Sequence, residues 1–260
     1  MAKYKFTNQL IFAMVMRDEE ICKIFIERLF NGRTVRKIHF SNVESEKSII
    51  MGIKSKSVRL DVMFEGDNTL YDLEMQIEPD YDIAKRTRYY HAAMNRHDLR
   101  RGDEYGNLRS SYVIFICLYD PFGLGEGIYN FQMTDERLGL QLGDGGYTII
   151  LNARCPKEKI PKGLETFFEY VDTGAVDKMD KFICRIDENV EKANNDEEVE
   201  SVMTLEEEMK IQSRRAEKRG LERGAADKQR EIAKNFKNSG ISPNIIAENT
   251  GLTLEEVEAL

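Results

Sequence analysis

The chain has 260 residues, of which 41% are hydrophobic, and a formal net charge of −8 at pH 7. This length and composition are sufficient for one full hydrophobic core with residues left for an appendage. The negative charge excludes indiscriminate coating of nucleic acid, so any DNA-binding surface must be local. The longest apolar run, residues 112–119, is far shorter than the roughly 18 residues of a membrane span, and we expect a cytoplasmic protein without one.

The first regular pattern in the chain is helical. In residues 18–32 (DEEICKIFIERLFNG), apolar side chains recur at helical spacing, acidic residues open the segment and an Asn-Gly pair closes it. We therefore predict a helix here. Residues 34–42 (TVRKIHFSN) alternate between apolar and polar side chains, which predicts a strand.

Residues 57–78 (SVRLDVMFEGDNTLYDLEMQIE) have the pattern of a β-hairpin with Asp67-Asn68 as a two-residue turn. The apolar faces of its two strands coincide only when paired residue numbers have an odd sum, and this turn gives a sum of 135. That register places Asp61 opposite Glu74 and brings Asp72 to the same polar face. Three carboxylates would then surround one point.

Like charges that face each other on a sheet destabilise it by up to ~1 kcal/mol. A bound divalent cation such as Mg²⁺ would remove the conflict, because hard cations bind carboxylate oxygens. The structural alternative is a pair of acids that is protonated, or screened by solvent on an exposed face. The residues alone leave both interpretations open.

The elements after the hairpin complete an α/β pattern. A long charged helix is expected over residues 82–101, and residues 111–120 (SYVIFICLYD) are apolar on both faces, as a central strand is. Strand-like segments follow at residues 127–133 and 147–152, before a helix near residues 162–171. We predict a mixed sheet flanked by helices.

Positive charge is concentrated directly after the hairpin. Residues 81–101 contain six basic side chains and two acidic ones, and a basic helix can neutralise phosphates. The candidate DNA-binding residues are Lys85, Arg86, Arg88, Tyr89 and Tyr90. Of these, Arg88 is the best single candidate for a phosphate contact. The alternative is a solvated helix face; neighbours on a helix point about 100° apart, so at least one of the two tyrosines should be buried.

The composition becomes strongly charged after about residue 186. We expect an α/β domain over residues 1–185 and a charged helical linker over residues 186–235. The linker lacks a sustained heptad pattern, which favours a solvated helix over a coiled coil.

The last predicted unit, residues 236–260, is a small helical pair. Ser242-Pro243 would start the first helix and Gly251 would end it, while Thr253 and Glu256 form a capping box for the second. Its several glutamates would repel phosphates, which favours packing or self-association over DNA recognition.

Asp61 is followed thirteen positions later by Glu74-Met75-Gln76, an arrangement that resembles the Asp…Glu-x-Lys core of the PD-(D/E)XK nuclease superfamily. The segments TNQLIFAMVM, VRLDV, YDLEMQ, KRTRYY and SYVIFICLYDPFG resemble, more narrowly, the PD-(D/E)XK family of transposases and recombination-promoting nucleases. The resemblance covers about residues 7–152. It implies a restriction-endonuclease-like core, here with a C-terminal helical extension.

The resemblance also implies roles for individual residues. Asp61 and Glu74 would hold Mg²⁺ or another divalent cation, the backbone carbonyl of Met75 would add a ligand, and Gln76 would orient the attacking water. The implied activity is metal-dependent endonucleolytic hydrolysis of DNA phosphodiester bonds, linked to recombination or transposition. Cleavage of both DNA strands would favour a homodimer.

The sequence departs from the family pattern at two positions. Gln76 replaces the usual lysine of the superfamily; it can orient water but carries no positive charge. Gln9 stands where related sequences commonly have an acid, and together with Asp72 it is an accessory candidate at the site. The alternative function is a catalytically weakened or inactive DNA-binding or assembly protein that keeps the nuclease fold.

Overall fold

The computed structural model describes all residues except 1–2, 33–34, 41–60 and 80–81. Part of the first predicted hairpin strand and Tyr81 therefore lie outside the described residues. The chain divides into two compact units, Met1–Asp196 and Glu197–Leu260. The boundary expected after residue 185 falls inside helix α6 (Lys181–Asn194), which packs on the helices near the N-terminus and belongs to the first unit.

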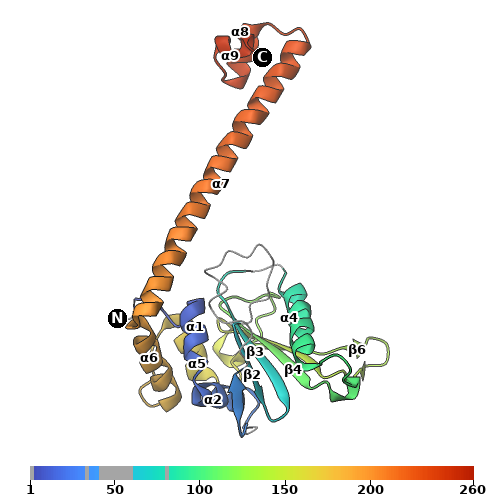
Figure 1. Cartoon of the computed structure of the whole chain (residues 1–260), viewed down its shortest axis with the longest axis vertical. Helices are drawn as coiled ribbons and strands as arrows, with labels where there is room; N and C mark the ends of the chain where they lie inside the picture. Colours follow the sequence, from blue (N-terminus) through green and yellow to red (C-terminus); the bar gives the residue numbers. More distant parts are fainter. Residues whose placement is uncertain (1–2, 33–34, 41–60, 80–81) are drawn as a thin grey trace. The chain divides into compact units, whose positions relative to one another are not determined.

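The first unit is built on a mixed sheet of six strands in the order β1-β2-β3-β4-β8-β5, as described here (Figure 1). Their bounds are β1 Ile38–Phe40, β2 Val62–Gly66, β3 Thr69–Gln76, β4 Ser110–Cys117, β5 Ile128–Phe131 and β8 Gly146–Asn152. Strands β3, β4 and β8 run parallel, and the outer pairings are antiparallel. The predicted mixed sheet is confirmed, with the apolar segment β4 at its centre. A small ribbon of β6 (Thr134–Asp135) and β7 (Leu140–Gln141) was not predicted.

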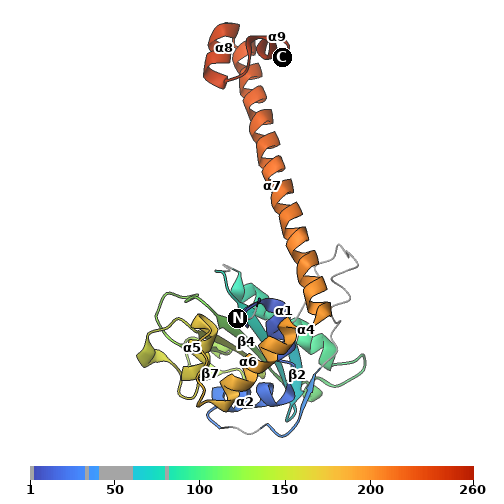
Figure 2. The ribbon, with the colours of Figure 1, turned by 90° about the vertical axis from the view of Figure 1, so that its left-hand side faces the viewer.

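Helices cover both faces of this sheet, as Figures 1 and 2 show. One face carries α6 together with α1 (Gln9–Val15), α2 (Glu19–Leu29) and α5 (Glu165–Thr173). The other face is covered by α4 (Ile83–Asp98), whose Ile83, Tyr90 and Met94 join a core with Leu70 and Phe115. Single 3₁₀ turns lie at Tyr105–Asn107 and Lys157–Lys159.

Helix α2 begins and ends where the sequence predicts. The Asp18 carboxylate accepts hydrogen bonds from the backbone N–H groups of Glu20 and Ile21, which satisfies donors of the first turn. At the other end Asn31 and Gly32 adopt φ angles of 53° and 88°. This left-handed backbone terminates the helix, and glycine adopts it without steric cost.

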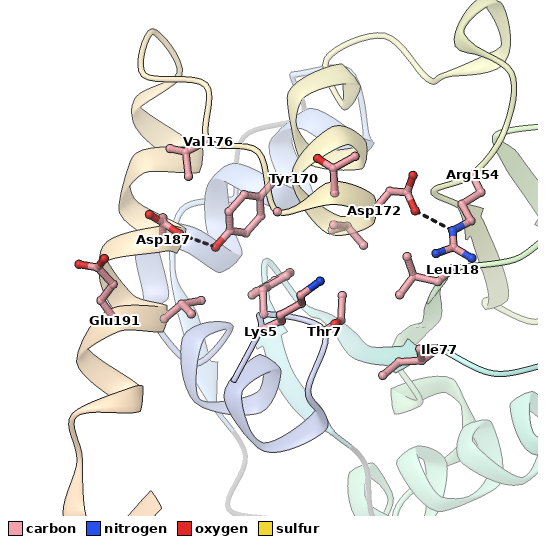
Figure 3. Close-up of a pocket in the computed structure, with 15 residues that line it drawn as sticks. Lys5, Thr7, Ile77, Leu118, Arg154, Tyr170, Asp172, Val176, Asp187 and Glu191 are labelled. Atoms are coloured by element: carbon pink, nitrogen blue, oxygen red, sulfur yellow. Dashed lines mark hydrogen bonds and ion pairs between the residues drawn. The ribbon is translucent and has the colours of Figure 1, made fainter. Parts of the chain in front are cut away.

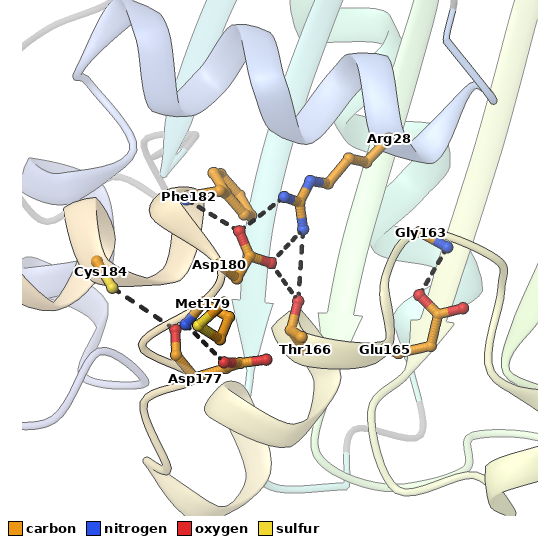
Figure 4. Close-up of polar contacts among 9 residues, drawn as sticks. All are labelled: Arg28, Gly163, Glu165, Thr166, Asp177, Met179, Asp180, Phe182 and Cys184. Atoms are coloured by element: carbon orange, nitrogen blue, oxygen red, sulfur yellow. Dashed lines mark hydrogen bonds and ion pairs between the residues drawn. The ribbon is translucent and has the colours of Figure 1, made fainter.

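An ion pair joins α2 to α5 and α6 (Figure 4). The Arg28 guanidinium donates two hydrogen bonds to the Asp180 carboxylate, at 2.7 and 2.8 Å, and the Thr166 hydroxyl donates a third at 2.5 Å. Burial acts to raise the pKa of Asp180, but these hydrogen bonds outweigh it and lower the pKa to about 2. Because Asp180 also caps α6 through the Phe182 N–H, one carboxylate fixes three helices.

The second unit consists of α7 (Glu197–Asn238), α8 (Pro243–Thr250) and α9 (Leu254–Glu258). Ser242 precedes α8, Gly251 ends it at φ 73°, and Thr253 with Glu256 forms the predicted capping box of α9. Ile246 and Val257 pack on Ala233 near the end of α7. The predicted helical pair is thus confirmed, and it packs against the long charged helix. In the described part of the chain, no helix is both long enough and apolar enough to cross a membrane.

Candidate metal and nuclease site

The hairpin of β2 and β3 connects Asp61 and Glu74 through hydrogen bonds between side chain and backbone. Its pairs, from Val62 with Leu73 to Gly66 with Thr69, have the predicted sum of 135, and Asp67 and Asn68 form the turn with φ angles of 48° and 61°. The Asp61 N–H donates to Glu74 Oε1 at 3.0 Å.

A reciprocal hydrogen bond completes this contact, because the Met75 N–H donates to Asp61 Oδ2 at 3.2 Å. The Glu74 carboxylate therefore accepts from the backbone of Asp61, and the Asp61 carboxylate accepts from the residue that follows Glu74. The strand alternation places Asp72 two positions before Glu74 on the same face of β3.

The three acids, which we call the acid cluster (Asp61, Asp72 and Glu74), are buried: their exposed fractions are 4%, 0% and 1%. This polar face of the hairpin is not open to solvent, because α4 covers it. Screening by solvent on an exposed face is excluded as the explanation for these acids.

Burial alters the protonation of the acid cluster. It raises the pKa of Glu74 well above its ordinary value, and the nearby charges of Asp72 and Asp61 raise it further. Burial likewise raises the pKa of Asp72, with an added contribution from Asp61. The cluster thus favours any species that supplies positive charge, whether a proton, a cationic side chain or a metal ion.

Asp72 has an unusual environment. Neither of its carboxylate oxygens has a hydrogen-bond partner among the described residues, although both are buried. Buried polar atoms without partners are rare and costly, and binding of an ion is one accepted explanation for them. Asp72 is therefore chemically suited to a position beside a cation.

Gln9 reaches the acid cluster from α1. Asn8 caps this helix with its side chain, and the next residue directs its amide Nε2 to Asp61 Oδ1 at 2.7 Å. The two accessory candidates, Gln9 and Asp72, thus lie with Asp61 and Glu74 in one place.

Arg86 enters the site from α4 and contacts two of the candidate residues. Its Nη1 donates to Gln76 Oε1 at 2.7 Å, and its Nη2 donates to Glu74 Oε2 at 3.2 Å. The Gln76 amide is oriented further by donation from Nε2 to the Glu78 carbonyl at 2.8 Å. The pattern of charges in the sequence predicted Arg86 as a DNA contact but missed its place beside the acids.

The Tyr90 hydroxyl holds the other side of this guanidinium, with Arg86 Nη2 donating at 2.8 Å. Tyr90 is 8% exposed and belongs to the core, so one of the two adjacent tyrosines is buried, as expected. The spacing of four residues between Arg86 and Tyr90 is the sequence signal that could have indicated this contact.

The outer surface of α4 presents the remaining DNA-binding candidates. Lys85, Arg88 and Tyr89 are exposed, and Lys85 forms an ion pair with Asp82 at 2.7 Å. Of the five predicted DNA-binding residues, these three lie on the helix surface while Arg86 and Tyr90 point toward the acid cluster.

The acid cluster supplies hard oxygen ligands, but protein donors occupy several of them. Gln9, Arg86 and two backbone N–H groups donate to the carboxylates of Asp61 and Glu74. Accordingly, no set of three or more His, Cys, Asp or Glu residues within the described ranges is arranged to hold a metal ion. A divalent cation would have to displace some of these donors, while the charge of the cluster and the unpartnered Asp72 fit such an ion.

A separate cavity of about 530 Å³ lies at the carboxyl ends of β3 and β4 (Figure 3). Ile77 and Leu118, which follow these strands, line it together with Lys5 and Tyr170. The Tyr170 hydroxyl donates to Asp187 at 3.0 Å across its wall. None of the acid cluster lines this cavity, so the two are distinct features.

Comparison with known protein families matches residues 3–234 to the family described as the PD-(D/E)XK nuclease family transposase. Comparisons with curated proteins and with solved structures give no match. The family match extends over most of both units and includes the α/β core with its hairpin acids. The chain therefore belongs to the PD-(D/E)XK nuclease family of transposases.

Proposed function

We propose that this protein is an endonuclease that hydrolyses DNA phosphodiester bonds with the help of a divalent cation, in recombination or transposition. The observation that carries the proposal is the reciprocal contact of Asp61 and Glu74 inside a buried acid cluster. Their carboxylates and the Met75 carbonyl would hold Mg²⁺ or a similar ion, with Gln9 and Asp72 as accessory residues. The ion would supply a nucleophilic water and offset charge on the phosphate.

Gln76 is suited to orient the attacking water. Its Oε1 accepts a hydrogen bond from Arg86, and a carbonyl oxygen has a second lone pair that can accept one from water. In the hydrolysis, the water oxygen bonds to phosphorus and gives up one proton to solvent, one P–O ester bond breaks, and the leaving oxygen takes up a proton from solvent. The fixed amide would keep the water in line during this exchange.

DNA would lie along the exposed side of α4. Lys85, Arg88 and Tyr89 are on that surface, next to the helix face that covers the acid cluster. Phosphate contacts from the two cations would position the backbone without reading its sequence. If both strands are cut, two copies of the chain would each supply one acid cluster, and a homodimer is expected on DNA.

Nicking of a supercoiled plasmid in the presence of Mg²⁺ tests the proposal. Asp61→Asn and Glu74→Gln should each lower the cleavage rate by about 100-fold or more, as the loss of a charged active-site group does. Lys178→Gln, an exposed substitution elsewhere in the first unit, is the control and should cleave like the parent. Nicking that survives EDTA, or equal nicking by Asp61→Asn, would contradict a metal-dependent role for these acids.

The alternative function is a DNA-binding or assembly protein that has lost cleavage. Gln9 favours this alternative, because its Nε2 donates a hydrogen bond to Asp61 Oδ1. An acid at position 9 would instead supply a further oxygen ligand for the metal ion. In that case the parent would bind DNA, and would bind Mg²⁺ weakly, without producing nicks. Measuring DNA binding in the same preparations separates an inactive binding protein from one that is misfolded.

A further inference from the structure

We propose that Arg86 contacts the scissile phosphate and supplies the positive charge that Gln76 cannot provide. This inference rests on the proposed nuclease function. Three carboxylates surround the site, and a phosphodiester that enters it brings further negative charge, which increases toward the transition state. A cation in addition to the metal would therefore accelerate the reaction.

The contacts of Arg86 place its charge where this requirement arises. The guanidinium lies within hydrogen-bond distance of Glu74 and of Gln76, the two residues proposed to hold the metal and to orient the water. Glu74 is 1% exposed at its side chain, whereas that of Arg86 is 29% exposed. The Arg86 side chain is thus partly accessible to solvent, whereas the acid that it contacts is not.

The guanidinium is held in position before any substrate binds. Tyr90 accepts hydrogen bonds from Arg86 Nη2 and Nε at 2.8 and 3.3 Å. The guanidinium also lies over the rings of Phe115 and Tyr90, with its carbon 5.2 and 5.4 Å from their centroids. A group fixed in this way loses little entropy when it binds a phosphate.

In the metal-free protein, Arg86 donates a hydrogen bond to Glu74 and so competes with a cation for the same carboxylate. Loss of the arginine should therefore have two opposite effects. Metal affinity should rise, because Arg86 no longer competes for Glu74 and no longer repels the metal ion. The cleavage rate should fall, because the phosphate loses its contact with the guanidinium. A merely structural arginine would not be expected to produce this combination.

Four proteins test the inference: the parent, Arg86→Gln, the double variant Arg86→Gln with Gln76→Lys, and Arg96→Gln. Arg96 is exposed on the same helix, so Arg96→Gln removes the same charge as Arg86→Gln and serves as the matched control. Single-turnover cleavage at saturating Mg²⁺ should fall about 100-fold for Arg86→Gln, and lysine at position 76 should restore at least part of it. Arg96→Gln should cleave at nearly the parent rate.

Calorimetric titration with Mg²⁺ supplies a readout that does not depend on cleavage, and Arg86→Gln should bind the ion several-fold more tightly than the parent. If the parent cleaves and Arg86→Gln cleaves equally well, the role of Arg86 is overturned while the nuclease function stands. If the parent does not cleave, the nuclease function fails and the Arg86 inference fails with it. Should Arg86→Gln not fold, the double variant decides, because a folded double variant without activity overturns the inference.

Discussion

Gln9 and Asp61, which are 52 positions apart in the sequence, share a hydrogen bond of 2.7 Å from Gln9 Nε2 to Asp61 Oδ1. This contact joins the first helix to the hairpin at the acid cluster. Position 9 is therefore a place where a single substitution can change the charge beside Asp61.

Gln9→Asp should therefore tighten Mg²⁺ binding by roughly tenfold and raise the cleavage rate, because hard cations prefer charged oxygen ligands. Without metal, the added carboxylate lies beside Asp61, and the variant should be less stable than the parent by ~1 kcal/mol. Calorimetry and melting curves with Mg²⁺ or EDTA measure both effects. Gln9→Ala is the control, since it removes the hydrogen bond without adding charge; unchanged Mg²⁺ affinity in Gln9→Asp would remove position 9 from the metal site.

Asp72→Asn should stabilise the metal-free protein at neutral pH. Because the folded-state pKa values of Asp72 and Glu74 are raised above their usual values of 3.8 and 4.5, folding keeps protons that the unfolded chain releases. The stability that the two protonated carboxyl groups contribute is fully present below about pH 4, and it is lost as the pH rises through their folded-state pKa values. Urea unfolding in EDTA should show that the free energy of unfolding falls less between pH 5 and pH 8 in Asp72→Asn than in the parent. An equal fall in both proteins would contradict a raised pKa of Asp72.

Asp180→Asn should lower the free energy of unfolding at pH 7 by about 1–2 kcal/mol, because the ion pair with Arg28 and the cap of α6 are weakened. The pKa of Asp180 is depressed to about 2, so its stabilisation is present above pH 4 and is lost as the pH falls through the folded-state value. The difference between variant and parent should accordingly shrink by pH 2.5.

Asp172→Asn is the matched control for this change, because Asp172 pairs with an Arg154 side chain that is 57% exposed. Exposed pairs contribute little, and this substitution should cost less than ~0.5 kcal/mol at any pH. Similar costs for the two substitutions in urea unfolding would mean that the Asp180 contacts do not connect the helices as described.

Lys85→Gln and Arg88→Gln should each weaken DNA binding and reduce the slope of log K against log salt by ~0.9, since each removes one phosphate contact. Both side chains are on the exposed surface of α4. Fluorescence anisotropy with a labelled duplex at several salt concentrations provides the slopes, and Lys178→Gln serves as the control. A slope that stays at the parent value in both variants would place the DNA on another surface.

Local patterns predicted the hairpin best. The turn at Asp67-Asn68 and the alternation of apolar side chains determine the register, and the structure has that register residue by residue. The start of α2 at Asp18 and the capping box at Thr253 were predictable for the same reason, because each depends on neighbours within a few positions.

Relationships between distant segments were not predictable from these patterns. The burial of Glu74 depends on α4 packing over the sheet, and the inward orientation of Arg86 depends on Tyr90 joining that core. A charged helix has the same composition whether its arginines face solvent or an acid. Likewise, residue 186 lies in a charged segment but belongs to a helix whose apolar side packs on α1 and α2.

We propose above that Asp61 and Glu74 together hold the catalytic cation, and anomalous scattering from crystals soaked in Mn²⁺ would locate that ion directly. We expect one strong anomalous peak between these two carboxylates and no such peak in Asp61→Asn crystals. A peak located elsewhere, or none at Mn²⁺ concentrations that support DNA cleavage, would contradict it.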